Sequence, residues 1–186
     1  PRCAQRTPTN QESTMVQNVK QIAENRFRET FGRHYEEFNV GDIYEHRPGR
    51  SITETDNTWF TLLTMNTHPM HFDKEYAKES EFGKCIVCSP FTVALMVGMS
   101  VTDVSQKAIA NLGWGDIKMT FPLFVGDTLV CESKVLGKRE SASRPGAGIV
   151  TVQTDGYNQD GKLVCTFTRT MLIAKIGHAV EDKVNY

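Results

Sequence analysis

The residues from Asn66 to Asp73 contain an unusual density of side chains that bind or transfer protons. The run reads Asn-Thr-His-Pro-Met-His-Phe-Asp, so it holds two imidazoles, a carboxamide and a carboxylate around one proline. An imidazole is the side chain whose unperturbed pKa lies closest to neutrality. His71 is therefore the candidate general base. The alternative is a structural histidine that hydrogen-bonds the backbone beside Pro69.

A second signal follows at Cys88-Ser89-Pro90, which leads into an apolar run from Phe91 to Val101. Serine and proline suit the N-cap and the first position of a helix. The first N–H groups of a helix have no partner within it, and the helix dipole favours negative charge there. The N–H of Ser89 is thus a candidate oxyanion donor, and it can serve as well as simple N-capping. A proton-transfer group beside such a helix start suits chemistry on a carbonyl.

Asn66 can hold a water molecule, because its amide both accepts and donates hydrogen bonds, but it cannot take up a proton at neutral pH. His71 must then move the proton alone, or a carboxylate compensates. In an extended chain Asp73 points the same way as His71 and can orient it; the alternatives for Asp73 are a helix cap or a solvated acid. Asp56 and Glu54 are further candidates.

Two more residues have open interpretations. His68 is either a second titrating group that contacts a carboxylate of a ligand or a partly buried structural histidine. A nucleophilic Cys88 would need an activating partner, and the sequence shows none. Cys85 and Cys88 form a CxxC, but no second ligand pair supports a metal site.

Composition narrows the class of protein. The chain has 186 residues, 39% of them hydrophobic, and a formal net charge of −1, which favours one domain and gives no sign of nucleic-acid or membrane binding. The apolar run at 91–101 is too short to cross a bilayer. Five cysteines without framework spacing predict reduced, mostly buried thiols in a cytoplasmic protein.

The order of elements predicts an α+β protein. Residues 1–14 lack the apolar core of a secretory signal and are expected to be disordered. Apolar spacing predicts an N-terminal helix over residues 15–32. Ile43 to Arg47 is expected to form a strand that stops at Pro48-Gly49, and Thr53 to Asp56 begins a helix.

The segment after the apolar helix is strand-like. Four antiparallel strands are expected, with a hairpin turn at 158–161, an exposed loop at 137–148 and a C-terminal tail at 177–186. A helix that is apolar on nearly all sides must be buried all round. These features suggest a sheet curled around a central helix, although periodicity alone does not choose this packing.

The motifs, in this order, resemble those of MaoC-like dehydratases, the hot-dog-fold relatives of R-specific enoyl-CoA hydratases. The resemblance covers residues 33–176. The matching segments are Thr53–Asp56 with Trp59-Phe60, Asn66–His71, Phe82-Gly83, Phe121–Leu129 and Asn158–Gly161. This resemblance implies a hot-dog domain and a homodimer with acyl-CoA bound at the subunit interface. It also implies no cofactor beyond the coenzyme A of the substrate.

The same resemblance assigns catalysis to His71 and Asn66 and an oxyanion hole to Ser89, where the family has glycine. The chain departs from the family motif Asp-x-Asn-Pro-aliphatic-His: the aspartate position holds Asn66, and the asparagine position holds His68. An asparagine at the first position also occurs in one branch of this family. That branch is linked to short branched dicarboxylic CoA esters of the mesaconyl-CoA or itaconyl-CoA type, and this chain resembles it at Asn66. His68, Asp73 and Cys88 remain candidates for supporting roles.

The resemblance implies reversible addition of water across the double bond of a short enoyl-CoA. Basic residues should then line the entrance for the phosphates of coenzyme A. The sequence does not choose among Lys84, Lys138, Arg139, Arg144 and Arg169. The alternatives are a non-catalytic acyl-CoA-binding protein, which Asn66 favours, and a hot-dog thioesterase. A thioesterase usually needs an acid on or near the central helix, and the first acid in the apolar run is Asp103.

Overall fold

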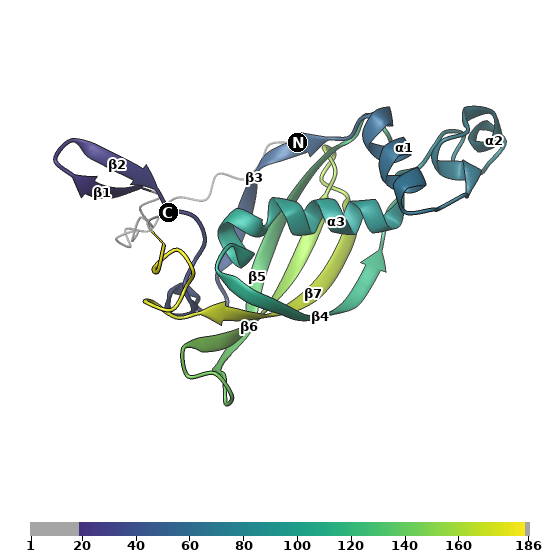
Figure 1. The fold of residues 1–186 in the computed structure, drawn as a ribbon. Coiled ribbons are helices and arrows are strands. Elements are labelled where there is room, and N and C mark those ends of the chain that lie inside the picture. Colours follow the sequence, from purple (N-terminus) through teal and green to yellow (C-terminus); the bar gives the residue numbers. More distant parts are fainter. Residues whose placement is uncertain (1–18, 185–186) are drawn as a thin grey trace, which may run out of the picture. The chain divides into compact units, whose positions relative to one another are not determined.

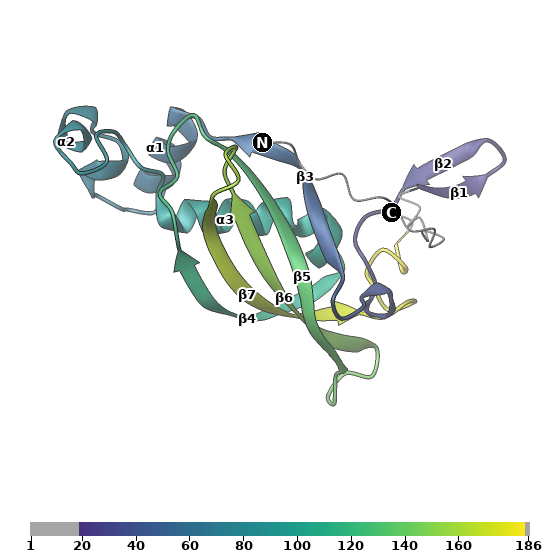
Figure 2. The same ribbon diagram turned by 180° about the vertical axis from the view of Figure 1, so that it is seen from behind.

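A computed structural model describes residues 19–184 of the chain. Its centre is the helix α3 (Ser89–Met99), which lies along the concave face of an antiparallel five-stranded sheet (Figure 1). The strand order is β3-β5-β6-β7-β4. The strands are β3 (Ile43–Ser51), β4 (Ala108–Met119), β5 (Thr128–Glu140), β6 (Ala147–Tyr157) and β7 (Leu163–Ala174). The predicted α+β class and the sheet curled around the apolar helix are confirmed (Figures 1 and 2).

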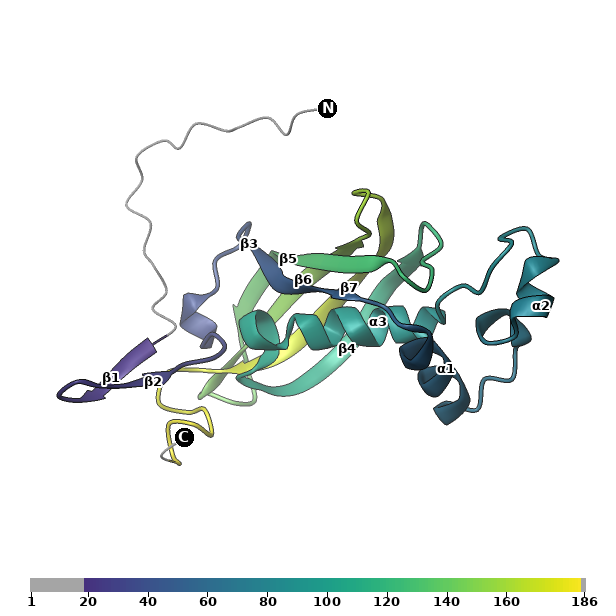
Figure 3. The ribbon, with the colours of Figure 1, turned by 90° about the horizontal axis from the view of Figure 1, so that it is seen from above.

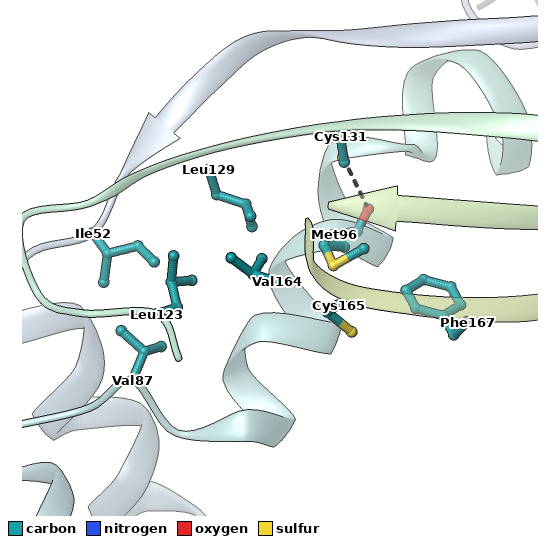
Figure 4. Packing of buried hydrophobic residues seen from close by; sticks show 9 residues of the cluster. All are labelled: Ile52, Val87, Met96, Leu123, Leu129, Cys131, Val164, Cys165 and Phe167. Carbon is teal, nitrogen blue, oxygen red and sulfur yellow. Dashed lines mark hydrogen bonds between the residues drawn. The ribbon is translucent and has the colours of Figure 1, made fainter. Parts of the chain in front are cut away.

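Alternating burial along β5, β6 and β7 turns one face of each strand toward α3. The predicted turn between β6 and β7 is present: the Gly161 N–H donates to the Asn158 carbonyl, and Gly161 has a φ of 72°. One apolar cluster packs under the first turns of α3. Figure 4 shows Met96 of α3 beside Cys131 of β5, whose Sγ lies 4.0 Å from the Met96 carbonyl oxygen.

A buried polar row interrupts the apolar core. On β5, Ser133 lies between Cys131 of the cluster under α3 and Val135 of a second apolar cluster. Arg169 holds the same place on β7, between Phe167 of the first cluster and Met171 of the second. Ser133 Oγ lies 2.8 Å from Thr154 Oγ1 and Arg169 Nη2 donates to Ser100 Oγ at 2.9 Å, so these pairs favour one register of the sheet beneath α3.

His46 of β3 belongs to this row and is fully buried. Its Nδ1 lies 3.1 Å from Asp103 Oδ2 and its Nε2 lies 2.8 Å from Ser133 Oγ. Burial lowers the pKa of His46, and the Arg169 and Arg33 cations lower it further, against the opposing hydrogen bond and charge of Asp103. The imidazole is therefore held neutral in the folded chain.

The N-terminal helix expected over residues 15–32 is wrong for the described part of that range. Residues 19–31 form a unit of their own, which contains the hairpin of β1 (Val19–Ala23) and β2 (Arg26–Glu29). The apolar residues here are valine, isoleucine and phenylalanine, which suit strands as well as helices. Asn25 adopts a φ of 53°, as the turn requires. The segment 1–14, expected to be disordered, lies outside the described residues.

Two strands extend further than expected. β3 continues past Pro48 to Ser51, because a register shift between His46 and Arg50 accommodates the proline on an edge strand. The expected loop over 137–148 shrinks to residues 141–146, since Gly137 pairs with Thr151 and extends the β5–β6 ribbon. Gly and charged residues at the end of a paired ribbon resemble a loop in sequence, which explains the error.

The central helix is not buried all round in this chain. Thr92 and Met96 are buried, but Ala94 and Gly98 are exposed. This open face adjoins β4, an edge strand with several exposed apolar residues. They are Ile109, Leu112, Trp114, Ile117 and Met119.

The remaining elements are short. η1 (Tyr35–Glu37) and the π-helical turn η3 (Val101–Ser105) lie before β3 and after α3 in the chain. The described part of the expected tail, residues 177–184, packs against the domain: Ala179 is buried, and His34 Nε2 lies 3.4 Å from Asp182 Oδ2. Cys88, Cys131 and Cys165 are buried and free, and burial raises the pKa values of Cys131 and Cys165 to about 12 and about 11. These two thiols stay protonated near neutral pH.

The neutral His46 predicts a pH dependence of stability. Its pKa is about 6.5 in an unfolded chain and lower when folded, so below about pH 6.5 the unfolded state binds more protons. Its contribution to the free energy of unfolding is complete above about pH 6.5 and is lost progressively as the pH falls from that value through the lower folded pKa. Urea denaturation from pH 8 to 5.5 should show a smaller loss for His46→Asn than for the wild type. The exposed His178→Asn should keep the wild-type slope, and equal slopes for all three proteins would contradict the assignment.

Candidate active site

Three short helical elements lie on the side of the domain where α3 begins. They are α1 (Glu54–Leu63), the 3-10 turn η2 (Pro69–His71) and α2 (Lys74–Lys78). Figures 1 and 3 show α1 beside the first turn of α3 and α2 farther out. The predicted helix start at Thr53 is confirmed, because Thr53 caps α1 through a capping box with Asp56. Together these elements carry the proton-handling residues to the start of α3.

His71 ends η2, and its ring is held in one tautomer. Its Nδ1 lies 3.0 Å from the backbone oxygen of Ile86. A carbonyl oxygen only accepts hydrogen bonds, so Nδ1 carries the proton when the ring is neutral, and Nε2 is left with a free lone pair. Ile86 precedes Ser89 by three residues, which limits the span of chain between their Cα atoms to roughly 10 Å.

Asn57 connects the elements of the site. It is fully buried on α1, and its Nδ2 donates to the carbonyl oxygens of His71 at 2.8 Å and Ile86 at 3.1 Å. Its Oδ1 accepts the Cys88 N–H at 2.9 Å. One amide thus ties α1, the base and the approach to α3 together. The sequence analysis did not identify Asn57. Asparagine is a poor helix former, so its presence inside an amphipathic helix could have indicated a specific hydrogen-bonding role.

Asn66 is half-buried and is the first residue of the segment 66–73 that contains His68 and His71. Its Oδ1 accepts the His68 N–H at 3.0 Å, and its Nδ2 lies 3.5 Å from Cys88 Sγ. These two contacts fix which end of the Asn66 amide is oxygen: the backbone N–H is a donor and faces Oδ1, and the sulfur is a weak acceptor and faces Nδ2. Oδ1 keeps a second lone pair. Cys88 is almost fully buried, and its thiol contacts Asn66.

The first turn of α3 differs slightly from the expected one. Ser89 is the first helical residue and Cys88 is the N-cap, without a side-chain cap. Within residues 19–184, no acceptor hydrogen-bonds the Ser89 N–H. This donor therefore remains available to a ligand, as expected from the sequence, while the alternative that Ser89 caps the helix with its side chain is wrong.

Asp73 and His68 both cap short helices. Asp73 Oδ1 accepts the N–H groups of Glu75 and Tyr76 at 3.0 and 3.1 Å, so the helix-cap alternative is confirmed. The hypothesis that Asp73 orients His71 is wrong, because the Ile86 carbonyl does so. His68 is exposed rather than partly buried; its Nδ1 accepts the Met70 N–H at 3.2 Å, and its ring centroid lies 6.0 Å from that of His71.

The carboxylates of α1 are already engaged. Asp56 accepts the Thr53 N–H, and the pKa of Asp56 is lowered by the hydrogen bonds from Thr53 and by Arg50. Glu54 forms an ion pair with Lys74 at 2.8 Å. Neither carboxylate is hydrogen-bonded to His71. The Nδ1 of His71 is bound by the Ile86 carbonyl, whereas in a catalytic dyad an acid would bind this nitrogen.

Two cavities flank these residues. One, of about 350 Å³, is lined by His71 together with charged residues of α1, α2 and the loop that precedes α3. The other, of about 620 Å³, is an apolar groove along the open face of α3 and β4, and its lining includes Ser89, Val93, Trp114 and Ile117. His71 and Ser89 therefore each line a space large enough for part of a small molecule.

Of the five basic candidates for phosphate binding, Lys84 alone lines the cavity of His71. Lys138 Nζ donates to backbone oxygens of η1 and its neighbours, and Arg139 lines a different cavity of about 450 Å³ between β4 and β7. Arg169 is buried and donates to Ser100 Oγ at 2.9 Å, so it is not placed at the surface where a phosphate of coenzyme A could bind. Arg144 lies in the exposed loop after β5.

Comparison with known proteins identifies the class. A sequence model of the mesaconyl-CoA hydratase family matches residues 11–183. A mesaconyl-CoA hydratase of Cereibacter sphaeroides is 31% identical over 144 residues, which cover 77% of this chain and 42% of that protein. The chain thus spans about two-fifths of the length of the curated relative.

Solved structures agree on the fold. An Archaeoglobus structure described as a monoamine oxidase regulatory protein has a TM-score of 0.69 at 31% identity, covering 77% of this chain and 95% of that one. A Mycobacterium tuberculosis protein with a double hotdog fold has a TM-score of 0.72 at 18% identity, covering 77% and 44%.

The sheet around α3 is therefore the hot-dog fold. The chain belongs to the mesaconyl-CoA hydratase family of MaoC-like dehydratases. Within residues 19–184, no helix has the length and apolar character needed to span a bilayer.

The role of Asn57 can be tested by Asn57→Ala. This change removes the buried amide that binds the carbonyl groups of His71 and Ile86 and the N–H of Cys88. The free energy of unfolding should fall by about 2–4 kcal/mol, measured by urea denaturation. The exposed Thr55→Ala on the same helix should change it by less than about 0.5 kcal/mol. A loss no larger than that of the control would show that the clamp contributes nothing.

Proposed function

We propose that this chain is an acyl-CoA hydratase and dehydratase. It adds water reversibly across the α,β double bond of a short, branched dicarboxylic enoyl-CoA of the mesaconyl-CoA or itaconyl-CoA type. The observation that carries the proposal is the His71 ring: its Nδ1 is fixed on the Ile86 carbonyl, which leaves the lone pair of Nε2 free, and His71 lines a cavity. Membership in a family described by mesaconyl-CoA hydratase activity supports the substrate class.

The reaction needs a base for the attacking water. Water adds to Cβ because the thioester carbonyl accepts the charge as an enolate, and a proton then returns to Cα. In the proposed mechanism Nε2 of His71 takes the proton from water and delivers it to Cα. Asn66 accepts a hydrogen bond from the same water through Oδ1 but exchanges no proton. A positioned base of this kind supplies roughly 10²–10⁴-fold.

The enolate oxygen needs donors that are already in place. The free Ser89 N–H at the start of α3 meets this need, and the helix dipole adds to it. The donor belongs to the backbone, so a serine can replace the glycine of the family motif where the side chain has room. The exposed surface of Ser89 is consistent with this.

The active assembly is proposed to be a homodimer. The apolar groove on α3 and β4 has almost no polar lining, and β4 is an edge strand whose outer backbone groups are unpaired. A second copy would cover both. The free buried thiols also suit a reducing cytoplasm.

A non-catalytic acyl-CoA-binding protein is the second candidate. Asn66 favours it, because this position holds no carboxylate. Turnover separates the two: the binding protein would take up acyl-CoA esters without changing any of them.

His71→Asn tests the catalytic assignment. With mesaconyl-CoA and crotonyl-CoA as substrates, loss of the conjugated thioester absorbance should slow by about 10²–10⁴-fold, since the base is removed. Mass spectrometry should show the corresponding gain of 18 Da in the wild-type reaction, as one molecule of water adds. The exposed His178→Asn should retain the wild-type rate. Binding of both esters with no turnover by the wild type would favour the second candidate.

Ile117→Lys tests the dimer. A buried unpaired ammonium would disfavour association across β4, so light scattering should show a dimer for the wild type and a monomer for the variant. Hydratase activity should fall with the dimer. Leu136→Lys, at an exposed site on the interior strand β5, should leave the mass unchanged. A wild type that is monomeric and fully active would refute this arrangement.

A further inference from the structure

We propose that Lys84 determines the preference for an anionic acyl group, by binding its distal carboxylate in the cavity beside His71. This inference rests on the proposed function. It assigns the cavity of about 350 Å³ to the acyl group rather than to coenzyme A.

The position of the base decides which part of the substrate enters this cavity. The proton transfers take place at the double bond, which belongs to the acyl group, and His71 lines this cavity rather than the apolar groove. The phosphates of coenzyme A lie a whole pantetheine arm away from that bond. A cation that shares a small cavity with His71 is therefore placed for a charge on the acyl group.

The charges in the cavity single out Lys84. Three lysines and two glutamates line it, but Lys74 is paired with Glu54 at 2.8 Å. Lys78 and Glu75 lie three residues apart on α2 and cancel in formal charge, although they form no ion pair with each other. Lys84 differs from Lys78 in its ring contact, which positions its ammonium. Among the ion pairs of residues 19–184, none involves Lys84.

The Lys84 ammonium is held by a contact that does not neutralise it. Its Nζ lies 4.1 Å from the centroid of the Phe124 ring. A cation–π contact positions the ammonium and leaves its N–H donors available for an anion. Lys84 also precedes Ile86 by only two residues, which keeps its backbone within roughly 7 Å of the carbonyl that fixes His71.

The rest of the lining fits a short branched acid. Phe72 and Val125 supply an apolar wall for a methyl branch, and the cavity volume lies within the range of small-ligand sites. A long unbranched chain would suit the larger apolar groove better. The cavity thus offers both charged and apolar side chains to a ligand.

Binding of unreactive esters tests the inference without any turnover. Succinyl-CoA and butyryl-CoA have the same chain length, and only the first carries a distal carboxylate. By titration calorimetry the wild type should bind succinyl-CoA at least about tenfold more tightly, as one charge-assisted hydrogen bond provides. Lys84→Met should lose this preference, Lys84→Arg should retain much of it, and the exposed Lys162→Met should match the wild type.

Two outcomes would overturn the inference. Equal affinity of the wild type for both esters would show that no carboxylate is recognised. Equal weakening of both esters in Lys84→Met would show that the lysine binds a phosphate of coenzyme A; in that case butyryl-pantetheine, which lacks the nucleotide phosphates, would bind wild type and variant alike.

Turnover separates this inference from the proposed function. The ratio of kcat/KM for mesaconyl-CoA to that for crotonyl-CoA should fall about tenfold in Lys84→Met, whereas Lys162→Met should keep the wild-type ratio. If the wild type hydrates neither ester, the proposed function fails. The preference measured with succinyl-CoA still decides whether Lys84 recognises a carboxylate.

Discussion

The site depends on one buried amide. Asn57 supplies both donors to carbonyl groups and its acceptor to a backbone N–H, which joins α1, η2 and the approach to α3. Buried backbone groups need partners, and here no regular strand or helix provides them. The clamp fixes the Ile86 carbonyl, this carbonyl fixes the tautomer of His71, and the tautomer decides which nitrogen can act as a base. The orientation of His71 thus depends on a buried amide on a different helix.

The central helix imposes a second constraint. Its side chains are apolar on nearly every side, yet this chain covers only part of them. The same uncovered face holds the free N–H of Ser89. A partner on that face would exclude water from the donor and strengthen its interaction with a developing negative charge. Under the proposed function, association and oxyanion binding would both use this face of α3, where the single hot-dog unit leaves apolar surface open.

Much of this arrangement was predictable from sequence. His71, Ser89 and the strands after α3 follow from residue types, periodicity and family motifs, and such signals are local. The partner of His71 was not predictable, because a backbone carbonyl has no residue signature and Asp73 competed for the role until its cap on α2 was visible. The hairpin at β1 and β2 was missed because valine, isoleucine and phenylalanine at mixed spacing fit both helix and strand.

The charges of the site form a consistent set under the proposed function. A substrate with a distal carboxylate brings an extra negative charge close to the base. Asn66 is half-buried, so an aspartate at this position would repel a nearby negative charge more strongly than it would in water. Asn66 keeps the hydrogen-bonding shape without the charge, and Lys84 supplies an unpaired cation in the cavity of His71. The departure from the family motif then reads as an adjustment to an anionic substrate: the amide still positions water, and the imidazole alone carries the proton.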